Sequence, residues 1–162
     1  MRYFYDCEFV EDGHTIDLIS IGVVAEDGRE YYAVSTEFDQ NRAGTFVRTR
    51  VLPALPYPGD PAWMSRRAIR AGLERFLQVG ADIELWAWKA AYDHVALVQL
   101  WGDMTRLPRW VPRFSHELCQ RWEDRGRPPL PARTEVVHDA LADARRNLAI
   151  WRVLEPLQRS PH

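Results

Sequence analysis

The sequence predicts an α/β fold built on a mixed sheet, in which an antiparallel three-strand meander is extended by parallel strands and flanked by helices. Three β-rich segments follow one another at the start of the chain, and turn residues such as Asp27-Gly28 separate them. Amphipathic helical patterns then alternate with single short strands. The length of 162 residues suits one domain, so we expect a single domain over 1–162.

The expected elements follow from side-chain pattern and from residues that begin or end helices. The expected strands cover residues 2–9, 15–25, 29–36, 83–88 and a short stretch within 110–114. The expected helices cover residues 39–52, 66–78, 90–101, 115–124 and 139–157. Proline-rich surface loops are expected over 53–61 and 125–133, because proline interrupts both helices and sheet ladders.

Composition excludes several classes of function. A net charge of −2 provides no overall basic field for long duplex DNA. The chain has no signal-peptide pattern and no apolar run of ~18 residues, so we expect a soluble, cytoplasmic protein without a membrane partner. The two cysteines, Cys7 and Cys119, are far apart and are expected to be reduced. Seven tryptophans fit core and interface packing, or stacking on nucleobases.

Two carboxylates stand two residues apart in the first expected strand. Alternate side chains of a strand point to the same face, so Asp6 and Glu8 share a face within an apolar run. A divalent cation between them would relieve their repulsion and their loss of hydration. Taken alone, the pair fits the exposed face of an edge strand better than a metal site. The interpretation therefore depends on partners elsewhere in the chain.

Two further acids occupy positions where sites form. Asp93 begins a helix just after the strand over 83–88, although a first-turn acid also fits the helix dipole alone. His138 and Asp143 are five residues apart, which within one helix leaves their side chains roughly 140° apart. They converge only if His138 precedes the helix, with Asp139 as the N-cap. Asp143 then lies in the first or second turn and faces the sheet.

Four acids and a histidine together predict a metal site. Carboxylate oxygens select Mg²⁺ or Mn²⁺, and the sequence has no Cys/His spacing typical of zinc. A pair of such ions ~4 Å apart is the usual apparatus for in-line displacement at phosphate. We therefore expect two cations per site, and the expected ligands are Asp6, Glu8, Asp93 and Asp143.

A family resemblance becomes specific at these residues. The motifs that carry it are Asp6-x-Glu8, Asp93 and His138-x-Ala140-x-x-Asp143. They resemble the motifs of the DEDDh 3′–5′ exonucleases, which have a ribonuclease-H-like fold, and their order fits over nearly the whole chain. Two departures are Phe9-Val10, where a Thr-Gly often follows the first motif, and Lys89, where an asparagine often stands. The chain is also similar to small actinobacterial-type exoribonucleases (exoribonuclease AS) described as preferring adenylate-containing RNA.

The resemblance implies a reaction and a set of roles. The substrate is the 3′ end of single-stranded RNA, from which 5′-mononucleotides are released, with a preference for adenylate-containing RNA. Asp6, Glu8 and Asp143 hold one cation, and Asp93 helps Asp6 to hold the second. His138 is the general base that takes a proton from the attacking water, since histidine exchanges protons near neutral pH.

Substrate contacts are expected from aromatic and basic side chains near the acids. The candidates are Phe9, Trp88, Lys89 and Tyr92, with Trp86, Arg127 and Arg133 as further ones. Each of these also fits a plain core or surface role when taken alone. The family resemblance and the surplus of tryptophan together favour a homodimer.

Three other functions remain compatible with the sequence. A DNA 3′–5′ exonuclease of the proofreading type would use the same acids, because sensing the ribose 2′-hydroxyl depends on geometry. A non-catalytic module that binds RNA ends could share the fold, although it would not need all four acids and the histidine. A structural protein could use its tryptophans for packing alone.

Overall fold

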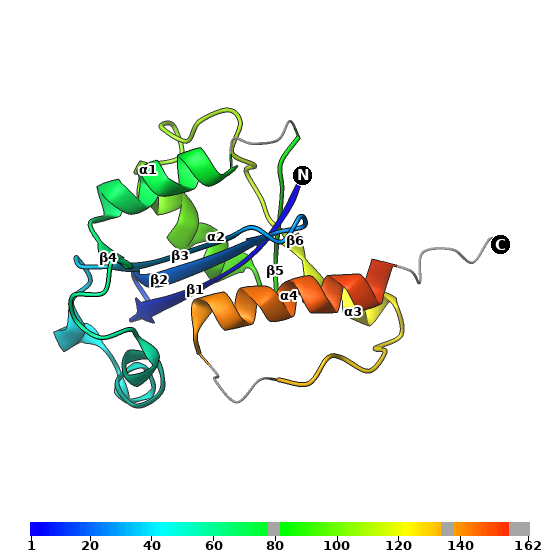
Figure 1. Cartoon of the computed structure of the whole chain (residues 1–162), viewed down its shortest axis with the longest axis horizontal. Coiled ribbons are helices and arrows are strands. Elements are labelled where there is room, and N and C mark those ends of the chain that lie inside the picture. Colours follow the sequence, from blue (N-terminus) through cyan, green and yellow to red (C-terminus); the bar gives the residue numbers. More distant parts are fainter. Residues whose placement is uncertain (78–81, 134–137, 156–162) are drawn as a thin grey trace.

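A computed structural model describes residues 1–77, 82–133 and 138–155. In it, a six-stranded mixed sheet lies between two layers of helices (Figure 1). The strands are β1 (Arg2–Glu11), β2 (Ile16–Ala25), β3 (Glu30–Ser35), β4 (Trp63–Met64), β5 (Glu84–Ala87) and β6 (His116–Glu117). The α-helices are α1 (Arg66–Leu77), α2 (Ala91–Val98), α3 (Leu118–Asp124) and α4 (Ala140–Leu154).

The strand order β4-β3-β2-β1-β5-β6 confirms the predicted sheet. β1, β2 and β3 form the antiparallel meander, and β5 and β6 extend it in parallel beside β1. β4 adds a parallel strand beside β3 at the opposite edge. This strand was not predicted, because two residues are too short to show a strand period. The fold class is therefore as expected, with one additional edge strand.

Each face of the sheet buries its own apolar cluster. α1 and α2 cover one face, and α3 and α4 cover the other (Figure 1). Tyr3, Tyr5 and Cys7 of β1 point into the first cluster, while Phe4 points into the second. This alternation is the strand period of two, and it places Asp6 and Glu8 on the α4 face. Within the described ranges, no helix is long and apolar enough to cross a membrane.

Two predicted elements were wrong. Instead of one helix over 39–52, the chain forms 3₁₀ turns at Gln40–Arg42 and Leu52–Ala54 around a π-helical turn at Val47–Val51. Gly44 lies between the first 3₁₀ turn and the π-helical turn. Val47 and Val51 instead pack in a separate small cluster beside β1 and β2.

The predicted strand within 110–114 was also wrong. The last strand begins later, at His116, and the helix expected over 115–124 begins at Leu118 with Glu117 as its N-cap. Pro108 and Pro112 lack the N–H groups that a strand needs, and the backbone N–H of Val111 donates to the Pro108 carbonyl in a turn. The predicted helix end at Gln78 and the predicted last turn over 156–157 lie outside the described residues.

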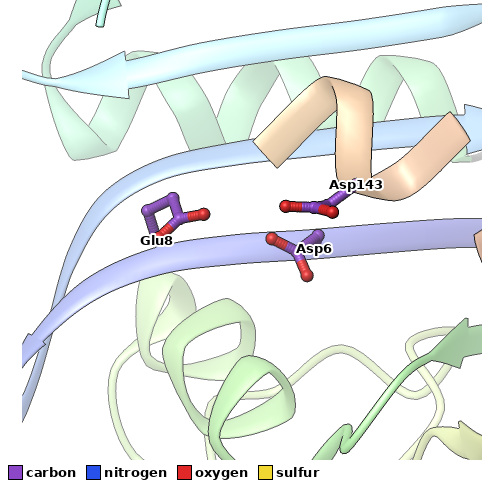
Figure 2. A group of neighbouring side chains, drawn as sticks. All are labelled: Asp6, Glu8 and Asp143. Carbon is purple, nitrogen blue, oxygen red and sulfur yellow. The ribbon is translucent and has the colours of Figure 1, made fainter. Parts of the chain in front are cut away.

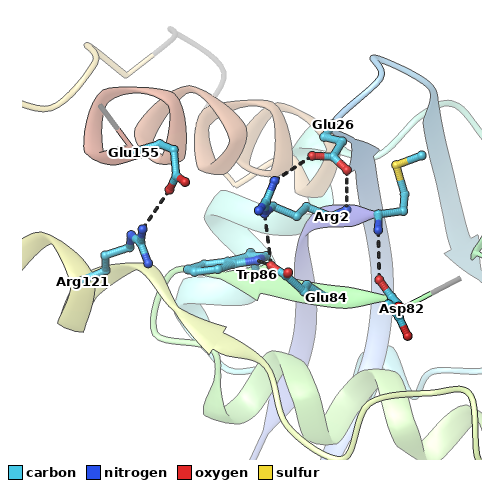
Figure 3. A network of polar contacts seen from close by, with 8 residues as sticks. Arg2, Glu26, Asp82, Glu84, Trp86, Arg121 and Glu155 are labelled. Carbon is cyan, nitrogen blue, oxygen red and sulfur yellow. Dashed lines mark hydrogen bonds and ion pairs between the residues drawn. The ribbon is translucent and has the colours of Figure 1, made fainter. Parts of the chain in front are cut away.

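A polar network joins the starts of β1 and β5 (Figure 3). The Arg2 guanidinium donates to Glu26 and Glu84, both at 3.1 Å. Glu84 also accepts from the indole N–H of Trp86 at 2.9 Å. Because these bonds join the first strand to both of its neighbours, they fix the strand register on which the position of Asp6 depends.

Candidate active site

Three carboxylates from two elements converge on the α4 face of the sheet. Asp6 and Glu8 project from β1, and Asp143 projects toward them from the first turn of α4 (Figure 2). One oxygen from each carboxylate lies within 4.8 Å of the other two. A single cation could therefore contact all three residues. The two acids of β1 alone would provide only two of these ligands.

A glycine allows α4 to come this close. Gly22 of β2 lies directly opposite Asp6 in the strand register. A Cβ atom built on Gly22 would lie 2.4 Å from the backbone of Ala140 and Leu141. Any larger residue would therefore push the start of α4, and Asp143 with it, away from the sheet. A glycine inside a strand often marks such a close backbone approach.

The start of α4 has the predicted geometry. Asp139 is the N-cap, and its side chain accepts from the backbone N–H of Ala142 at 2.7 Å. His138 precedes the cap with φ of 68°, a left-handed conformation that costs a non-glycine residue roughly 1–2 kcal/mol. This turn of the chain directs the imidazole into the same pocket as Asp143, where its ring packs edge-on against Phe46 at 4.8 Å.

Asp93 reaches the site from the other layer of helices. It is buried in the first turn of α2, and its Oδ1 accepts from the backbone N–H of Cys7 at 2.8 Å. β5 pairs with β1 only over Arg2–Phe4, so the N–H of Cys7 is free of a strand partner and accessible to this side chain. The bond fixes the Asp93 carboxylate in the pocket that also contains Asp6.

The acids repel one another, and burial adds to the cost of their charges. Burial raises the pKa of Asp6 well above its usual range, and repulsion from Asp93, Glu8 and Asp143 adds to this effect. Burial and repulsion from Asp143 raise the pKa of Glu8 to about 8. Burial also raises the pKa of Asp93 to about 7, although backbone hydrogen bonds oppose the shift.

A divalent cation fits this donor set. Among the described residues, no arginine, lysine or histidine forms an ion pair with Asp6, Glu8 or Asp143. Buried carboxylates without a partner are costly, and a bound cation removes that cost. Oxygen donors alone, without cysteine, favour Mg²⁺ or Mn²⁺. These residues therefore suit the metal that the sequence predicts.

One pocket of about 290 Å³ brings all the predicted site residues together. They are Asp6, Glu8, Phe9, Trp88, Lys89, Tyr92, Asp93, His138 and Asp143. Sequence positions from 6 to 143 meet here because the pocket lies where β1 and β5 diverge and where α2 and α4 begin. Of the further candidates, Arg133 lines the pocket as well. Trp86 is instead buried and stacks on His116, and Arg127 pairs with Glu123.

The aromatic candidates occupy two walls of the pocket. Phe9 lies on the opposite face of β1 from Glu8 and stacks on Tyr92 with ring centroids 6.0 Å apart. Tyr92 is 53% exposed, so this pair presents a flat apolar surface to solvent. Trp88 packs against Trp122 at 5.7 Å. β1 continues past Phe9 to Glu11, with a register shift after Glu8, so Phe9 is not a strand terminus.

The turn before α2 is held by a carboxylate that sequence reasoning missed. Glu117 accepts from the backbone N–H groups of Lys89 at 2.7 Å and Ala90 at 2.8 Å. Lys89 has φ of 57°, so this residue is also held in the left-handed conformation. The contacts position Lys89 at the pocket edge and set the start of the helix that carries Asp93.

Asn147 and Arg146 were also missed. Asn147 is 2% exposed, and its amide donates to the carbonyl of Tyr5 at 2.9 Å, which joins α4 to β1 beside Asp6. Its position four residues after Asp143, on the same helix face, was a usable signal. Arg146 lines the pocket as well, and nothing in its local sequence distinguishes it from Arg145.

Fold and site together define a class of protein, a nuclease-type α/β domain with a carboxylate cluster beside a histidine. Solved structures with this fold include the RNase domain of yeast Pop2, with a TM-score of 0.59 and 13% identity over 96% of this chain and 75% of that one. Pop2p from S. pombe in an Mg²⁺- and Mn²⁺-bound form gives a TM-score of 0.57 and 12% identity, covering 98% and 83%. At such low identity these likenesses establish the ribonuclease-H-like fold alone.

Sequence comparison gives the family. Residues 1–154 match the 3′-5′ exoribonuclease Rv2179c-like domain. The chain is 67% identical over 156 residues to the 3′-5′ exoribonuclease Rv2179c of Mycobacterium tuberculosis H37Rv, covering 95% of this chain and 93% of that protein. The 3′-5′ exoribonuclease MT2234.1 of strain CDC 1551 gives the same values. This chain therefore belongs to the Rv2179c-like 3′-5′ exoribonuclease domain family.

Proposed function

We propose that this protein is a metal-dependent 3′–5′ exoribonuclease that releases 5′-mononucleotides from single-stranded RNA. The observation that carries the proposal is the convergence of Asp6, Glu8 and Asp143, within 4.8 Å of one another, in a pocket that also contains His138. A family match over residues 1–154 supports the same activity. No other described pocket combines several buried acids with a histidine and a basic rim.

The residues have separate roles in this proposal. Asp6, Glu8 and Asp143 hold one Mg²⁺ or Mn²⁺ ion, and Asp6 with Asp93 holds a second. Bound divalent cations would lower the charge barrier at the phosphate and acidify the attacking water. Because the bond to Cys7 fixes the Asp93 carboxylate, that side chain is oriented before any ion arrives. This pre-organisation reduces the reorganisation required during the reaction.

His138 is the proposed general base, which makes the enzyme DEDDh-type. The imidazole would accept a proton from the water that attacks the terminal phosphodiester. The bond between phosphorus and the 3′-oxygen breaks, and the leaving 3′-oxygen takes a proton from solvent water. His138 is not part of the carboxylate cluster, so it can exchange protons without leaving a metal ion. Its left-handed backbone and its contact with Phe46 restrict the ring to the pocket side of α4.

The substrate end is proposed to be single-stranded RNA, with a preference for adenylate. Unpaired bases stack on aromatic rings, and the stacked Phe9–Tyr92 pair offers such a surface next to the acids. Trp88 and Lys89 line the same pocket and are proposed to contact the sugar-phosphate backbone or a neighbouring base. The adenylate preference rests on the resemblance to the adenylate-preferring subgroup.

We also propose a cytoplasmic homodimer. Both cysteines are free thiols, as expected of a protein in a reducing compartment. The dimer rests on the resemblance to small exonucleases, and exposed Met104 and Phe114 provide apolar surface that a second copy could cover. Light scattering after size exclusion would test the dimer, since a monomer mass at micromolar concentration would contradict it.

The activity is tested with labelled single-stranded RNA and DNA of matched sequence. Each strand is incubated with Mg²⁺ or Mn²⁺, and the incubation is repeated with EDTA. We expect mononucleotides from RNA with either metal and none with EDTA, with faster release from an adenylate run than from a uridylate run. Preferential digestion of DNA would point to the proofreading type of exonuclease, and stable binding without any product would indicate a non-catalytic module.

Two variants separate the metal ligands from the base. Asp143→Ala should abolish both Mn²⁺ binding and turnover, because it removes one of three converging carboxylates. His138→Ala should lower turnover by ~10²–10⁴ while Mn²⁺ affinity, measured by calorimetry, stays near that of the wild type. An equal loss of Mn²⁺ affinity in the His138 variant would show that the histidine is a ligand rather than a base.

A further inference from the structure

Arg146 differs from the other arginines that bury part of their guanidinium group. Among the described arginines, Arg29, Arg66, Arg70 and Arg146 each bury a nitrogen that lacks a hydrogen-bond partner. The first three each form an ion pair with a carboxylate. Within the described part of the chain, Arg146 forms no ion pair, although it lines the acidic pocket.

A second arginine lies in the same pocket. Arg133, which is exposed, lines the same pocket and likewise has no ion pair with any described residue. Burial lowers the pKa of Arg146, and repulsion from Arg133 lowers it further. The positive charge of Arg133 in turn opposes the rise in the pKa of Asp6. Two guanidinium groups thus lie close enough to repel, at the edge of the carboxylate cluster.

These arginines do not simply neutralise the acids. An arginine that served this purpose would contact a carboxylate, as Arg145 does when it pairs with Glu30 through two bonds of 2.6 and 2.8 Å. Arg146, the next residue on α4, makes no such bond to Asp143 one turn earlier. Both guanidinium groups therefore line the acidic pocket without an ion pair to its described carboxylates.

We propose that Arg133 and Arg146 form a phosphate-binding subsite that grips the RNA backbone beside the carboxylate cluster. The inference rests on the proposed function and adds to it the residues that hold the strand. A phosphodiester between the two groups would relieve their mutual repulsion and satisfy the buried nitrogen of Arg146. Guanidinium suits this role because its planar N–H groups match the oxygens of a phosphate.

Salt dependence of RNA binding provides the first test. Affinity for a labelled oligoadenylate is measured by fluorescence anisotropy in EDTA, over a range of KCl concentrations, so that binding is measured without turnover. Each lost phosphate contact should reduce the slope of log affinity against log salt by about 0.7. We expect this reduction, with about ten-fold weaker binding, in both Arg133→Gln and Arg146→Gln.

Arg145→Gln is the matched control. It removes the same charge from the adjacent position of α4, but its partner is Glu30 on β3 and it does not line the pocket. Its slope should equal that of the wild type. Thermal melting of each variant checks folding, and Arg133→Gln keeps the test decisive if Arg146→Gln proves unstable, because Arg133 is exposed.

A chemical double-mutant cycle identifies the phosphate. One neutral methylphosphonate linkage is placed at each of the last three positions of the RNA in turn. At the linkage that the arginines grip, the replacement should weaken binding to the wild type about ten-fold or more and leave binding to the Arg133→Gln/Arg146→Gln double variant unchanged. At the other linkages, the loss of affinity from the methylphosphonate and the loss from the double substitution should add.

The inference fails separately from the proposed function. Suppose that the wild type degrades RNA, that the losses of affinity from the arginine substitutions and from the methylphosphonate add at every linkage, and that the salt slopes of Arg133→Gln and Arg146→Gln equal that of Arg145→Gln. In that case the arginines do not form a phosphate subsite. If the wild type neither degrades nor binds RNA, the exoribonuclease proposal itself fails. An equal loss of slope in all three arginine variants would attribute the effect to general charge and would likewise overturn the subsite.

Discussion

Replacing Gly22 by alanine would test how closely α4 must approach the sheet. The added Cβ would lie 2.4 Å from backbone atoms of Ala140 and Leu141, whereas ordinary contacts begin at 3.4 Å. The helix start would therefore have to recede by about 1 Å. Because the obstructing atoms belong to the backbone, no side-chain rotation can relieve the clash. Asp143, in the first turn of the same helix, would move with it.

Two opposing effects determine the cost of Gly22→Ala. Alanine in a strand interior is favoured over glycine by roughly 0.5–1 kcal/mol, because glycine loses more conformational freedom on folding. Overpacking against a backbone costs typically 1–3 kcal/mol, so the steric term prevails. We expect the melting temperature to fall by several degrees, since 1 kcal/mol corresponds to about 2–4 °C for a domain of this size.

The effect on the site should exceed the effect on stability. Metal–ligand distances tolerate shifts of about 0.2 Å, and a displacement of about 1 Å in a catalytic group can reduce the rate about 10²-fold. Mn²⁺ titration by calorimetry and turnover on single-stranded RNA, both at a temperature where the variant is folded, measure this loss. We expect weakened Mn²⁺ binding and a fall in turnover of about 10²-fold.

Gly44→Ala is the control for this substitution. Gly44 has no heavy atom within 4 Å of an added Cβ and no positive φ, so the variant should melt and bind Mn²⁺ like the wild type. If Gly22→Ala also keeps wild-type Mn²⁺ affinity, turnover and melting temperature, then α4 does not rest on β2 at this position. The argument that Gly22 positions Asp143 would then be refuted.

Further predictions concern a buried amide, the acids and the helix cap. Asn147→Ala should lower the free energy of unfolding by about 1–3 kcal/mol in a denaturant titration, because the Tyr5 carbonyl loses its buried donor, and a change within error would disprove that role. In metal-free protein, Glu8 has a pKa of about 8 against an ordinary 4.5. Between these two values the folded protein holds a proton on Glu8 that the unfolded chain releases. The free energy of unfolding should therefore fall as pH rises from about 4.5 to about 8. The rise in melting temperature caused by Mn²⁺ should grow over the same pH range. A Mn²⁺ effect independent of pH would contradict this linkage. Asp139→Ala should cost about 1 kcal/mol by removing the cap on Ala142, with turnover retained on RNA, and loss of turnover in a folded variant would give Asp139 a direct role.

Local sequence was sufficient for much of the site. The alternation of β1 predicted that Asp6 and Glu8 share a face, since the strand period is fixed by backbone geometry. The spacing of five from His138 to Asp143 predicted a helix start with Asp139 as cap, and the structure confirms that start. Both inferences concern residues within one turn or one strand, where the backbone alone sets the directions of side chains.

Inferences about longer segments depended on contacts that the sequence does not state. The residues over 39–52 carry a helical pattern, yet they form 3₁₀ and π-helical turns. Val47 and Val51 pack against β1 and β2 there, and this tertiary packing overrides local propensity. The two-residue strands at both sheet edges form because a neighbouring strand presents backbone N–H and C=O groups that they can pair with, not because of their own sequence.

The sequence by itself determined the fold class, the set of candidate acids and the histidine, because these follow from periodicity, caps and motif spacing. Only the tertiary structure decided how the parts combine. It brought Asp93 to the free N–H of Cys7, and among the described residues it gave an ion-pair partner to Arg145 but not to the adjacent Arg146. It also let α4 reach the sheet at Gly22. These outcomes depend on distances between segments far apart in the chain, and such distances are set by packing rather than by local preference.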